Sequence, residues 1–302
     1  MTQISSTQDF LNKFGRHLGK TAATKKFWLH VLLYAVLSAG AVLMIVPFLW
    51  MVSTAFKTEP EVLQYPPVWL PRHLTFDSFI KVWQVIPLGR FFFNSIFVGV
   101  VITASQVLLD SLAAYGFARR RFPGRDLIFM IFLTTMMVPR QVTMIPLFMM
   151  MRSIPFTGGN GWIDSYWGLI VPGLSGAFGV FLLRQFFITI PVELEEAARI
   201  DGCSSINIFF RIMMPLAKPA LLSVGIFVFL WSWNDFIWPL IITNQVAMRT
   251  LPVGLSNLQG QYKISWSLLM AASVLATLPV VIAYLFFQRE FVQGITLTGL
   301  KG

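Results

Sequence analysis

Charge is scarce in this sequence. Only 12% of its 302 residues are Asp, Glu, Lys or Arg and 56% are hydrophobic, whereas about a quarter of the residues of ordinary soluble domains are charged. This shortage excludes a soluble globular domain and predicts a membrane protein. The single cysteine, Cys203, excludes an internal disulfide, and we expect it to be a reduced, small filler residue.

Residues typical of catalytic and metal sites are also scarce. The three histidines, His17, His30 and His73, form no His-Glu-x-x-His motif, so no metal site follows from them. The segment 15–21 resembles a phosphate-binding loop, but only three residues separate its glycines and no hydrophobic strand precedes it. We therefore expect no enzymatic activity from this chain by itself, no directly bound cofactor and no ATP hydrolysis.

Long uncharged segments are abundant, and about 20 apolar residues let a helix cross roughly 30 Å of hydrocarbon. We predict an all-α membrane bundle of six transmembrane helices at about 27–56, 91–118, 127–151, 166–188, 220–242 and 267–288. The chain then divides into an N-terminal tail (1–26), a transmembrane domain (27–288) with a polar loop at 189–219, and a C-terminal tail (289–302). The first apolar segment is too long for a signal peptide and should remain as an anchor.

The distribution of Lys and Arg predicts the orientation, because these residues are retained preferentially on the cytoplasmic side. Segments 1–26, 119–126, 184–219 and 289–302 hold 15 of them, against 8 in segments 57–90, 140–165 and 243–266, which have the same total length. Both termini and the polar loop are therefore expected in the cytoplasm. This bias explains most of the net charge of +10, so membrane lipid is the expected environment and no nucleic-acid partner is needed.

Two external loops have recognisable signals. Residues 57–90 carry five prolines and scattered aromatic residues, which suits an extended loop with one interfacial helix near 76–84. In the last external loop, 243–266, we expect the backbone to bend sharply near Gly254, because glycine has no Cβ.

Polar groups at membrane depth form one candidate site. Asp110 lies deep in the second predicted helix, and Asn234 and Asp235 lie within the fifth beside Trp233. Such groups usually face the bundle interior or a wet cavity. One interpretation is a solute pathway, in which aromatic faces stack on sugars and amides or carboxylates bind hydroxyls. The alternative is interhelical hydrogen bonding that fixes the packing.

Residues 193–215 form a charged island between two apolar segments. Its ions need water or a partner protein, because unpaired charges in hydrocarbon are costly. Acidic residues predominate at its start, whereas helices that rest on anionic lipid favour basic faces. Docking to a protein is therefore the better interpretation.

The island should contain two short helices. Three glutamates fall in the first turn of the first helix, where the helix dipole favours acids, and Gly202 should end it. Ala197 and Ala198 would give it a small-residue face for close approach of a protein. Ser204 or Ser205 can cap a second helix, which Pro215 should stop.

At this point the sequence resembles a known family. Glu196-Ala197-Ala198, then Gly202, then Ile212-x-Met214-Pro215 resembles the cytoplasmic loop of membrane subunits of ATP-binding-cassette importers, with Met214 at a position usually held by leucine. Further stretches are similar to the second permease of carbohydrate importers of the maltose-transporter type: Phe181–Phe187, Trp233–Pro239, Arg249–Leu255, Gln288–Gly294 and the Lys301-Gly302 end.

The resemblance implies a role for each part. Residues contacting a cytoplasmic ATPase subunit would be Glu195, Glu196, Ala197, Ala198, Asp201, Gly202, Ile212 and Pro215. A loop reaching the extracytoplasmic solute-binding protein would contain Thr250, Leu251, Pro252, Val253 and Gly254, and the C-terminal tail would contact the ATPase pair. The complex would hold a homologous second permease and two ATPase subunits carrying ATP and Mg, in the cytoplasmic membrane of a bacterium or archaeon.

The family function implied is ATP-driven import of a saccharide or sugar-like solute by alternating access. Sugar phosphates and polyols are open alternatives as solutes. A transporter or channel driven by an ion gradient is an alternative of another class, but it predicts a dense set of embedded ionisable residues, whereas only Asp110, Arg140 and Asp235 are present. A membrane-embedded enzyme lacks a nucleophile or metal constellation.

Overall fold

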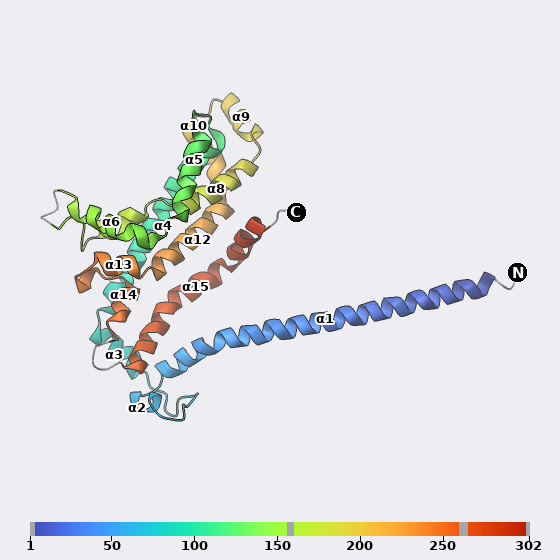
Figure 1. Ribbon diagram of the computed structural model, residues 1–302, viewed down its shortest axis with the longest axis horizontal. Coiled ribbons are helices and arrows are strands. Elements are labelled where there is room, and N and C mark those ends of the chain that lie inside the picture. Colours follow the sequence, from blue (N-terminus) through green and yellow to red (C-terminus); the bar gives the residue numbers. More distant parts are fainter. Residues whose placement is uncertain (1–3, 156–159, 260–264, 300–302) are drawn as a thin grey trace.

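The computed structural model describes residues 4–155, 160–259 and 265–299, with side chains between Phe27 and Phe286 and at Gln288 within these ranges. Every regular element in these ranges is helical, as the sequence predicted. The long first helix, α1 (Ile4–Ala55), projects away from the other helices, which pack together (Figure 1). The Lys301-Gly302 end, which is part of the resemblance, lies outside the described ranges.

Four helical stretches are long and apolar enough to span a membrane. They are Phe27–Ala55 within α1, α4 (Leu88–Arg119), the stretch Tyr166–Thr189, and Trp266–Phe286 within α15 (Trp266–Gly299). The third stretch consists of α7 (Tyr166–Ile170), the 3-10 turn η2 (Val171–Gly173) and α8 (Ala177–Thr189). These spans lie where the sequence predicted them.

Two further candidates for spans are bent helix pairs. In one, α5 (Arg125–Thr134) and η1 (Thr135–Met137) turn by 100° into α6 (Arg140–Ser153). In the other, Ser205–Leu216 turns by 79° into α12 (Lys218–Asn234). Counting each bent pair as one span gives the predicted six. The span predicted over 127–151 is divided at Pro139, which has no amide donor for a continuous helix.

Three other predicted boundaries need correction. The first helix begins at Ile4 and the last continues to Gly299. The segments expected as tails are therefore largely helical. Counting apolar residues could not show this, because it misses polar turns that extend a helix beyond the span. The fifth helix ends at Asn234, and a separate α13 (Ile237–Ile242) follows. Asn234 and Asp235 therefore lie at a break and not inside one helix.

At one end of the bundle, here called the α3 end, lie α2 (Glu59–Val62) and the predicted interfacial helix α3 (Asp77–Val85). This end also holds η4 (Val246–Met248) and α14 (Leu251–Ser256). The sharp bend expected near Gly254 is wrong, because Gly254 lies within α14. The absence of its side chain instead permits close contact with another helix, as described below.

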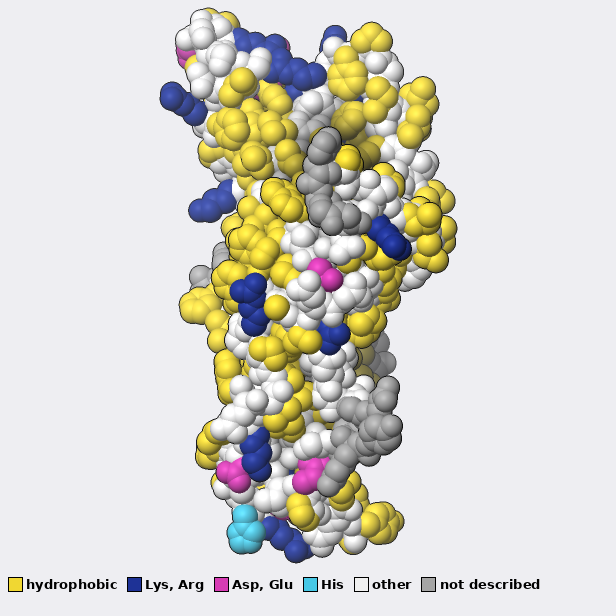
Figure 2. Space-filling model, turned by 90° about the vertical axis from the view of Figure 1, so that its left-hand side faces the viewer, with side chains coloured by type: hydrophobic (Ala, Val, Ile, Leu, Met, Phe, Trp, Pro, Cys, Tyr) yellow, Lys and Arg dark blue, Asp and Glu magenta, His cyan; other side chains and the backbone are white. Residues whose placement is uncertain are grey.

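The opposite end, here called the α9 end, carries the charged island. It consists of α9 (Glu193–Ile200), α10 (Ser205–Ile208), a π-helical turn η3 (Phe209–Met213) and α11 (Met214–Leu216). In Figure 2, hydrophobic side chains cover much of the visible face. Several Lys and Arg side chains lie together at the upper end, where Figure 1 shows α9 and α10, and others are scattered along the rest of the face.

Two apolar cores stabilise the bundle. The larger one joins α4, α8 and α12 to η3, and it includes Val180, Phe187 and Phe209. The smaller one, at the α3 end, packs α3 and α14 against α4 and α15, and it includes Phe91 and Trp233. The helix α4 contributes to both cores.

Candidate functional site

The α9 helix has the ends that its sequence predicts. Three glutamates occupy its first turn, where the dipole favours negative charge. Gly202 follows with a φ of +79°, a conformation that glycine adopts without cost. The Ser204 side chain then accepts a hydrogen bond of 3.3 Å from the Asn207 amide and caps α10.

The two faces of α9 have different surroundings. Glu195 and Ala198 are buried against the rest of the chain, while Glu196 and Ala197 are exposed and Ile200 is 86% exposed. Of the predicted small-residue face, only Ala197 is therefore open to a partner. Glu193 is exposed as well and lies three residues before Glu196, so the surface that α9 presents outward combines two acids, one small residue and one large apolar residue.

Glu195 is held by the chain itself. It is 2% exposed, and its carboxylate lies 3.2 Å from Arg119 Nε and 3.4 Å from Arg199 Nη2. The Tyr115 hydroxyl also donates to Glu195 Oε2 at 3.2 Å. Arg119 and Tyr115 both belong to the last turns of α4. Glu195 therefore fixes α9 to α4, in place of the direct partner contact that the resemblance implied.

Arg119 and Tyr115 also bind neighbouring segments. Arg119 Nη2 donates to the carbonyl oxygens of Phe187, at 2.7 Å, and of Ile190, which lie at the C-terminal end of α8, where carbonyls lack helical partners. The Tyr115 ring packs against Phe187 and, at 5.3 Å between centroids, against Phe209 of η3. The sequence analysis counted Arg119 only among the basic residues of segment 119–126, because nothing in its spacing reveals contacts 68 and 71 residues away.

The second half of the island differs from the prediction. Pro215 does not end the helix that starts at Ser205; it lies within α11, after the π-helical turn, and the chain bends at Ala217 before α12. Pro215 is exposed, and Ile212 is partly buried against the larger core.

Asp110 joins two helices. It is fully buried, and its carboxylate accepts hydrogen bonds from Ser175 Oγ at 2.7 Å and from the Gly176 amide at 3.1 Å. A Cβ placed on Gly179 would lie 2.2 Å from Asp110 Oδ2. Asp110 thus caps the start of α8, which favours the packing interpretation over the pathway one.

The other three predicted pathway residues have separate surroundings. Trp233 is buried in the smaller core beside Phe229, whereas the Asn234 side chain is exposed. Asp235 forms an ion pair of 3.0 Å with Arg140 Nη2. Because Arg140 begins α6 and Asp235 follows α12, this ion pair joins the break of one span to the break of another.

The predicted binding-protein segment packs against α4. Thr250, Leu251, Val253 and Gly254 are buried and Pro252 is partly buried. A Cβ on Gly254 would lie 2.1 Å from the Phe91 ring. The open projecting loop implied by the resemblance is therefore not what these five residues form; their exposed neighbours are Asn257 and Gln259.

Two polar residues of α4 hold this segment in place. Asn94 Nδ2 donates to the carbonyls of Ala247 and Arg249 at 2.9 and 2.8 Å. Ser95 Oγ accepts from the Leu251 amide at 2.7 Å. Sequence reasoning missed both residues, because a lone polar residue in an apolar span shows that a partner exists without showing which.

Glu59 is a further residue that the sequence did not reveal. Its carboxylate accepts hydrogen bonds from the Trp266 and Ser267 amides at 2.9 and 3.2 Å and from the hydroxyls of Ser265 and Ser267. Burial raises the pKa of Glu59, but these hydrogen bonds outweigh it, so the pKa lies below its ordinary value of 4.5. Glu59 caps α15 across the α3 end.

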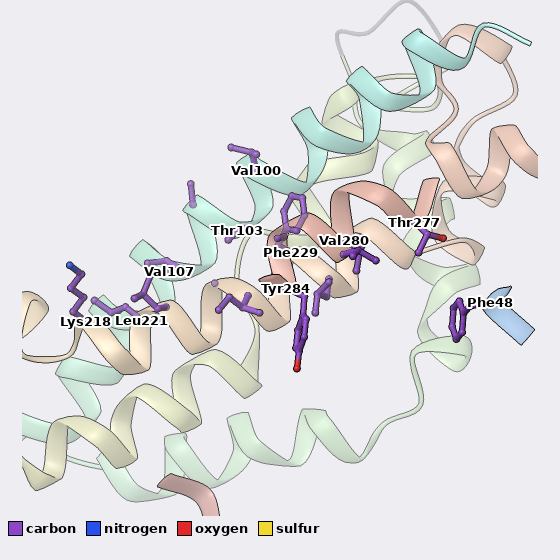
Figure 3. Close-up of a pocket in the computed structure, with 17 residues that line it drawn as sticks. Phe48, Val100, Thr103, Val107, Lys218, Leu221, Phe229, Thr277, Val280 and Tyr284 are labelled. Atoms are coloured by element: carbon purple, nitrogen blue, oxygen red, sulfur yellow. The ribbon is translucent and has the colours of Figure 1, made fainter. Parts of the chain in front are cut away.

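A large hollow opens between α4, α12 and α15 (Figure 3). Its volume is about 900 Å³, and its lining is almost entirely apolar, with Val107, Leu221, Phe229 and Val280 among the contributing residues. None of the predicted pathway residues lines it, and Lys218 is its single charged residue. A surface without convergent polar groups suits an apolar helix better than a hydroxyl-rich solute.

Comparison with known families decides the assignment. The model for binding-protein-dependent transport system inner membrane components matches residues 106–297. The chain belongs to this family. It is therefore a permease subunit of a binding-protein-dependent importer and a multi-pass inner-membrane protein.

No group of His, Cys, Asp or Glu within the described ranges could hold a metal ion.

Individual relatives agree with this family. The chain is 41% identical to the arabinooligosaccharide transport permease AraQ of Bacillus subtilis over 77% of this chain and 81% of that protein. It is 33% identical to the lactose transport permease LacG of Rhizobium radiobacter over 86% and 93% of the two chains. Its fold matches a chain of a bacterial importer of alginate with a TM-score of 0.76 at 24% identity, covering 87% and 96% of the two chains.

Proposed function

We propose that this permease serves an ATP-driven importer of a sugar, most suitably an oligosaccharide. Its relatives are named for arabinooligosaccharides and lactose, and a similar fold occurs in an alginate importer. Alternating access would then carry the solute through a pathway shared with a homologous permease. Sugar phosphates and polyols are tested as alternatives in the same experiment.

The observation that carries the ATPase part of the proposal is the outward face of α9. Glu196, Ala197 and Ile200 form an exposed surface on a helix that is fixed from behind by Glu195. This face offers a partner protein one large apolar side chain beside acidic ones, on a helix whose opposite side is buried against the chain. We assign this face, together with Asp201 and Gly202, to a cleft of a cytoplasmic ATPase subunit, which carries ATP and Mg.

This assignment sets the orientation of the chain. The α9 end faces the cytoplasm and the α3 end faces the solute-binding protein, whose presence beside a similar permease is described for a bacterial alginate transporter. Both termini then lie in the cytoplasm, and the C-terminal part of α15 can reach the ATPase pair. The apolar hollow in Figure 3 is where helices of the homologous permease would pack.

For solute contact we propose the end of α12. Trp231 is 71% exposed, and Asn234 lies one turn further along the helix and is also exposed. Residues three apart share a helix face, so an aromatic ring and an amide are presented together. The pairing of Asp235 with Arg140 and the role of Asp110 as a cap leave these ionisable groups occupied, which argues against ion-gradient coupling.

The experiment is purification of the subunit with its partners, reconstitution in nanodiscs, and measurement of ATP turnover with the solute-binding protein. The panel would hold arabinooligosaccharides, lactose, alginate oligosaccharides, a hexose phosphate and a polyol. Stimulation by an oligosaccharide supports the proposal, stimulation only by the phosphate or the polyol replaces the solute class, and solute movement by the isolated subunit without ATP refutes the ATPase coupling. In a responsive complex, Trp231→Ala should raise the KM for solute, while Trp167→Ala, at an exposed site on α7, should not.

A further inference from the structure

The helix α4 is held by side-chain contacts with other segments near both of its ends. At the α9 end, Tyr115 and Arg119 hold Glu195 of α9; these three residues are here called the inner clamp. At the α3 end, Asn94 and Ser95 hold the segment 247–251; these two residues are the outer clamp. A helix of 32 residues spans about 48 Å.

We propose that α4 is the rigid connector through which the ATPase-facing helix α9 and the external segment 247–254 move together. This inference rests on the proposed function of α9 and adds the element that transmits its displacement. Neighbouring glutamates would then have different tasks: Glu196 contacts the ATPase, whereas Glu195 is a positioning residue that passes the movement to α4.

The contacts at the inner clamp suit transmission. Arg119 binds the end of α8 as well as Glu195, and Tyr115 packs against both Phe187 and Phe209. Displacement of α9 cannot leave the end of α4 in place without breaking a buried ion pair, which is costly when one charge loses its partner. The three segments around Arg119 therefore move as one body.

The outer clamp also joins α4 tightly to other segments. Asn94 is fully buried, and all three of its hydrogen-bonding contacts are to other segments, because Tyr166 Oη also donates to its Oδ1 at 2.8 Å. The Phe91 ring fills the space above Gly254. A shift or rotation of α4 must accordingly displace the segment that begins at Ala247. Coupling between distant sites needs such an element, whose position both sites influence.

The test uses the assembled transporter with a reporter cysteine. Gln259→Cys is introduced in a Cys203→Ala background, because Cys203 is the single native cysteine and Gln259 is exposed next to the external segment. The rate of maleimide labelling is measured with and without ATP and vanadate, in the absence of the binding protein. A change in this rate on nucleotide trapping reports movement at the α3 end.

Glu195→Gln at the inner clamp and Asn94→Ala at the outer clamp are each expected to abolish the nucleotide-dependent change while the complex still assembles. The double variant should be no worse than either single one, because both break the same connection. Asp126→Asn, in an exposed ion pair with Arg125, is the matched control and should retain the change. Retention in either clamp variant, or additive partial losses, overturns the proposal.

Two milder variants test the proposal if Glu195→Gln and Asn94→Ala prevent assembly of the complex. Tyr115→Phe removes one hydrogen bond to Glu195 and Ser95→Ala removes one to Leu251, and each should reduce the change while leaving assembly intact. An undiminished change in both refutes the connector. Failure of the parent complex to retain ATPase subunits would refute the proposed function instead, and Glu196→Gln should weaken that retention whereas Glu195→Gln should not.

Discussion

Gly179 and Asp110 provide a quantitative test of helix packing inside the bundle. In Gly179→Ala the added Cβ would lie 2.2 Å from Asp110 Oδ2, so the carboxylate must leave Ser175 Oγ and the Gly176 amide. Overpacking costs about 1–3 kcal/mol, and hydrogen bonds to a charged group contribute about 1.5–3 kcal/mol. Replacing a helical glycine by alanine returns up to about 1 kcal/mol. The net loss of stability should therefore lie between about 1.5 and 6 kcal/mol.

The same substitution should behave differently once Asp110 is shortened. Asp110→Ala alone leaves the Gly176 amide without its partner and should cost about 2–4 kcal/mol. In that background the nearest clash for Gly179→Ala is only the residual approach of 3.2 Å to the Cβ of residue 110. The second substitution should then change stability by less than about 1 kcal/mol, a large departure from additivity.

The assay is thermal unfolding in detergent, followed by the fluorescence of the ten tryptophans. Gly116→Ala is the matched control, because a Cβ there meets no atom within 4 Å. Equal losses from Gly179→Ala in both backgrounds would refute the reasoning. A raised KM for solute in Asp110→Ala at unchanged melting temperature would restore the pathway interpretation of Asp110.

Three further predictions follow from other contacts. Gly254→Ala should destabilise the α3 end by about 1–3 kcal/mol through overpacking against Phe91, measured by the same fluorescence, and wild-type stability would contradict the buried position of α14. Gly202→Ala and Gly202→Asp both introduce strain of about 1–2 kcal/mol at a positive φ, but no atom of the chain lies within 4 Å of the new Cβ. Only the Asp variant should therefore lose ATPase co-purification. Equal losses in the two variants would show that the backbone strain causes the effect. The pKa of Glu59 is lowered on folding. The contribution of Glu59 to stability is therefore present above its ordinary pKa of 4.5 and is lost as the pH falls through the pKa of the folded protein. Glu59→Gln should flatten the melting-temperature profile in this acidic range, and an unchanged profile would show that the cap of α15 contributes nothing.

The positions of the membrane spans could be predicted from the sequence, whereas their breaks and ends could not. Apolar length located the four continuous spans, because the cost of placing polar groups in lipid depends on composition. The same counting could not show that the third span breaks at Pro139 or that the fifth ends at Asn234, since proline and polar residues are compatible with either a kink or an end. It also could not extend α1 and α15 into polar sequence.

Within the island, local signals determined α9, its acidic first turn and the left-handed Gly202, because helix dipoles and backbone sterics act over one or two turns. Only the tertiary structure decided that Glu195 turns inward to Arg119 while Glu196 turns outward. Two adjacent glutamates are indistinguishable in sequence, and the partner that separates them comes from another helix. For the same reason the partners of Asn94 and Asp110 could not be predicted from the sequence. A polar residue in an apolar span indicates that it has a hydrogen-bonding partner, but only the packing of the helices determines which group that partner is.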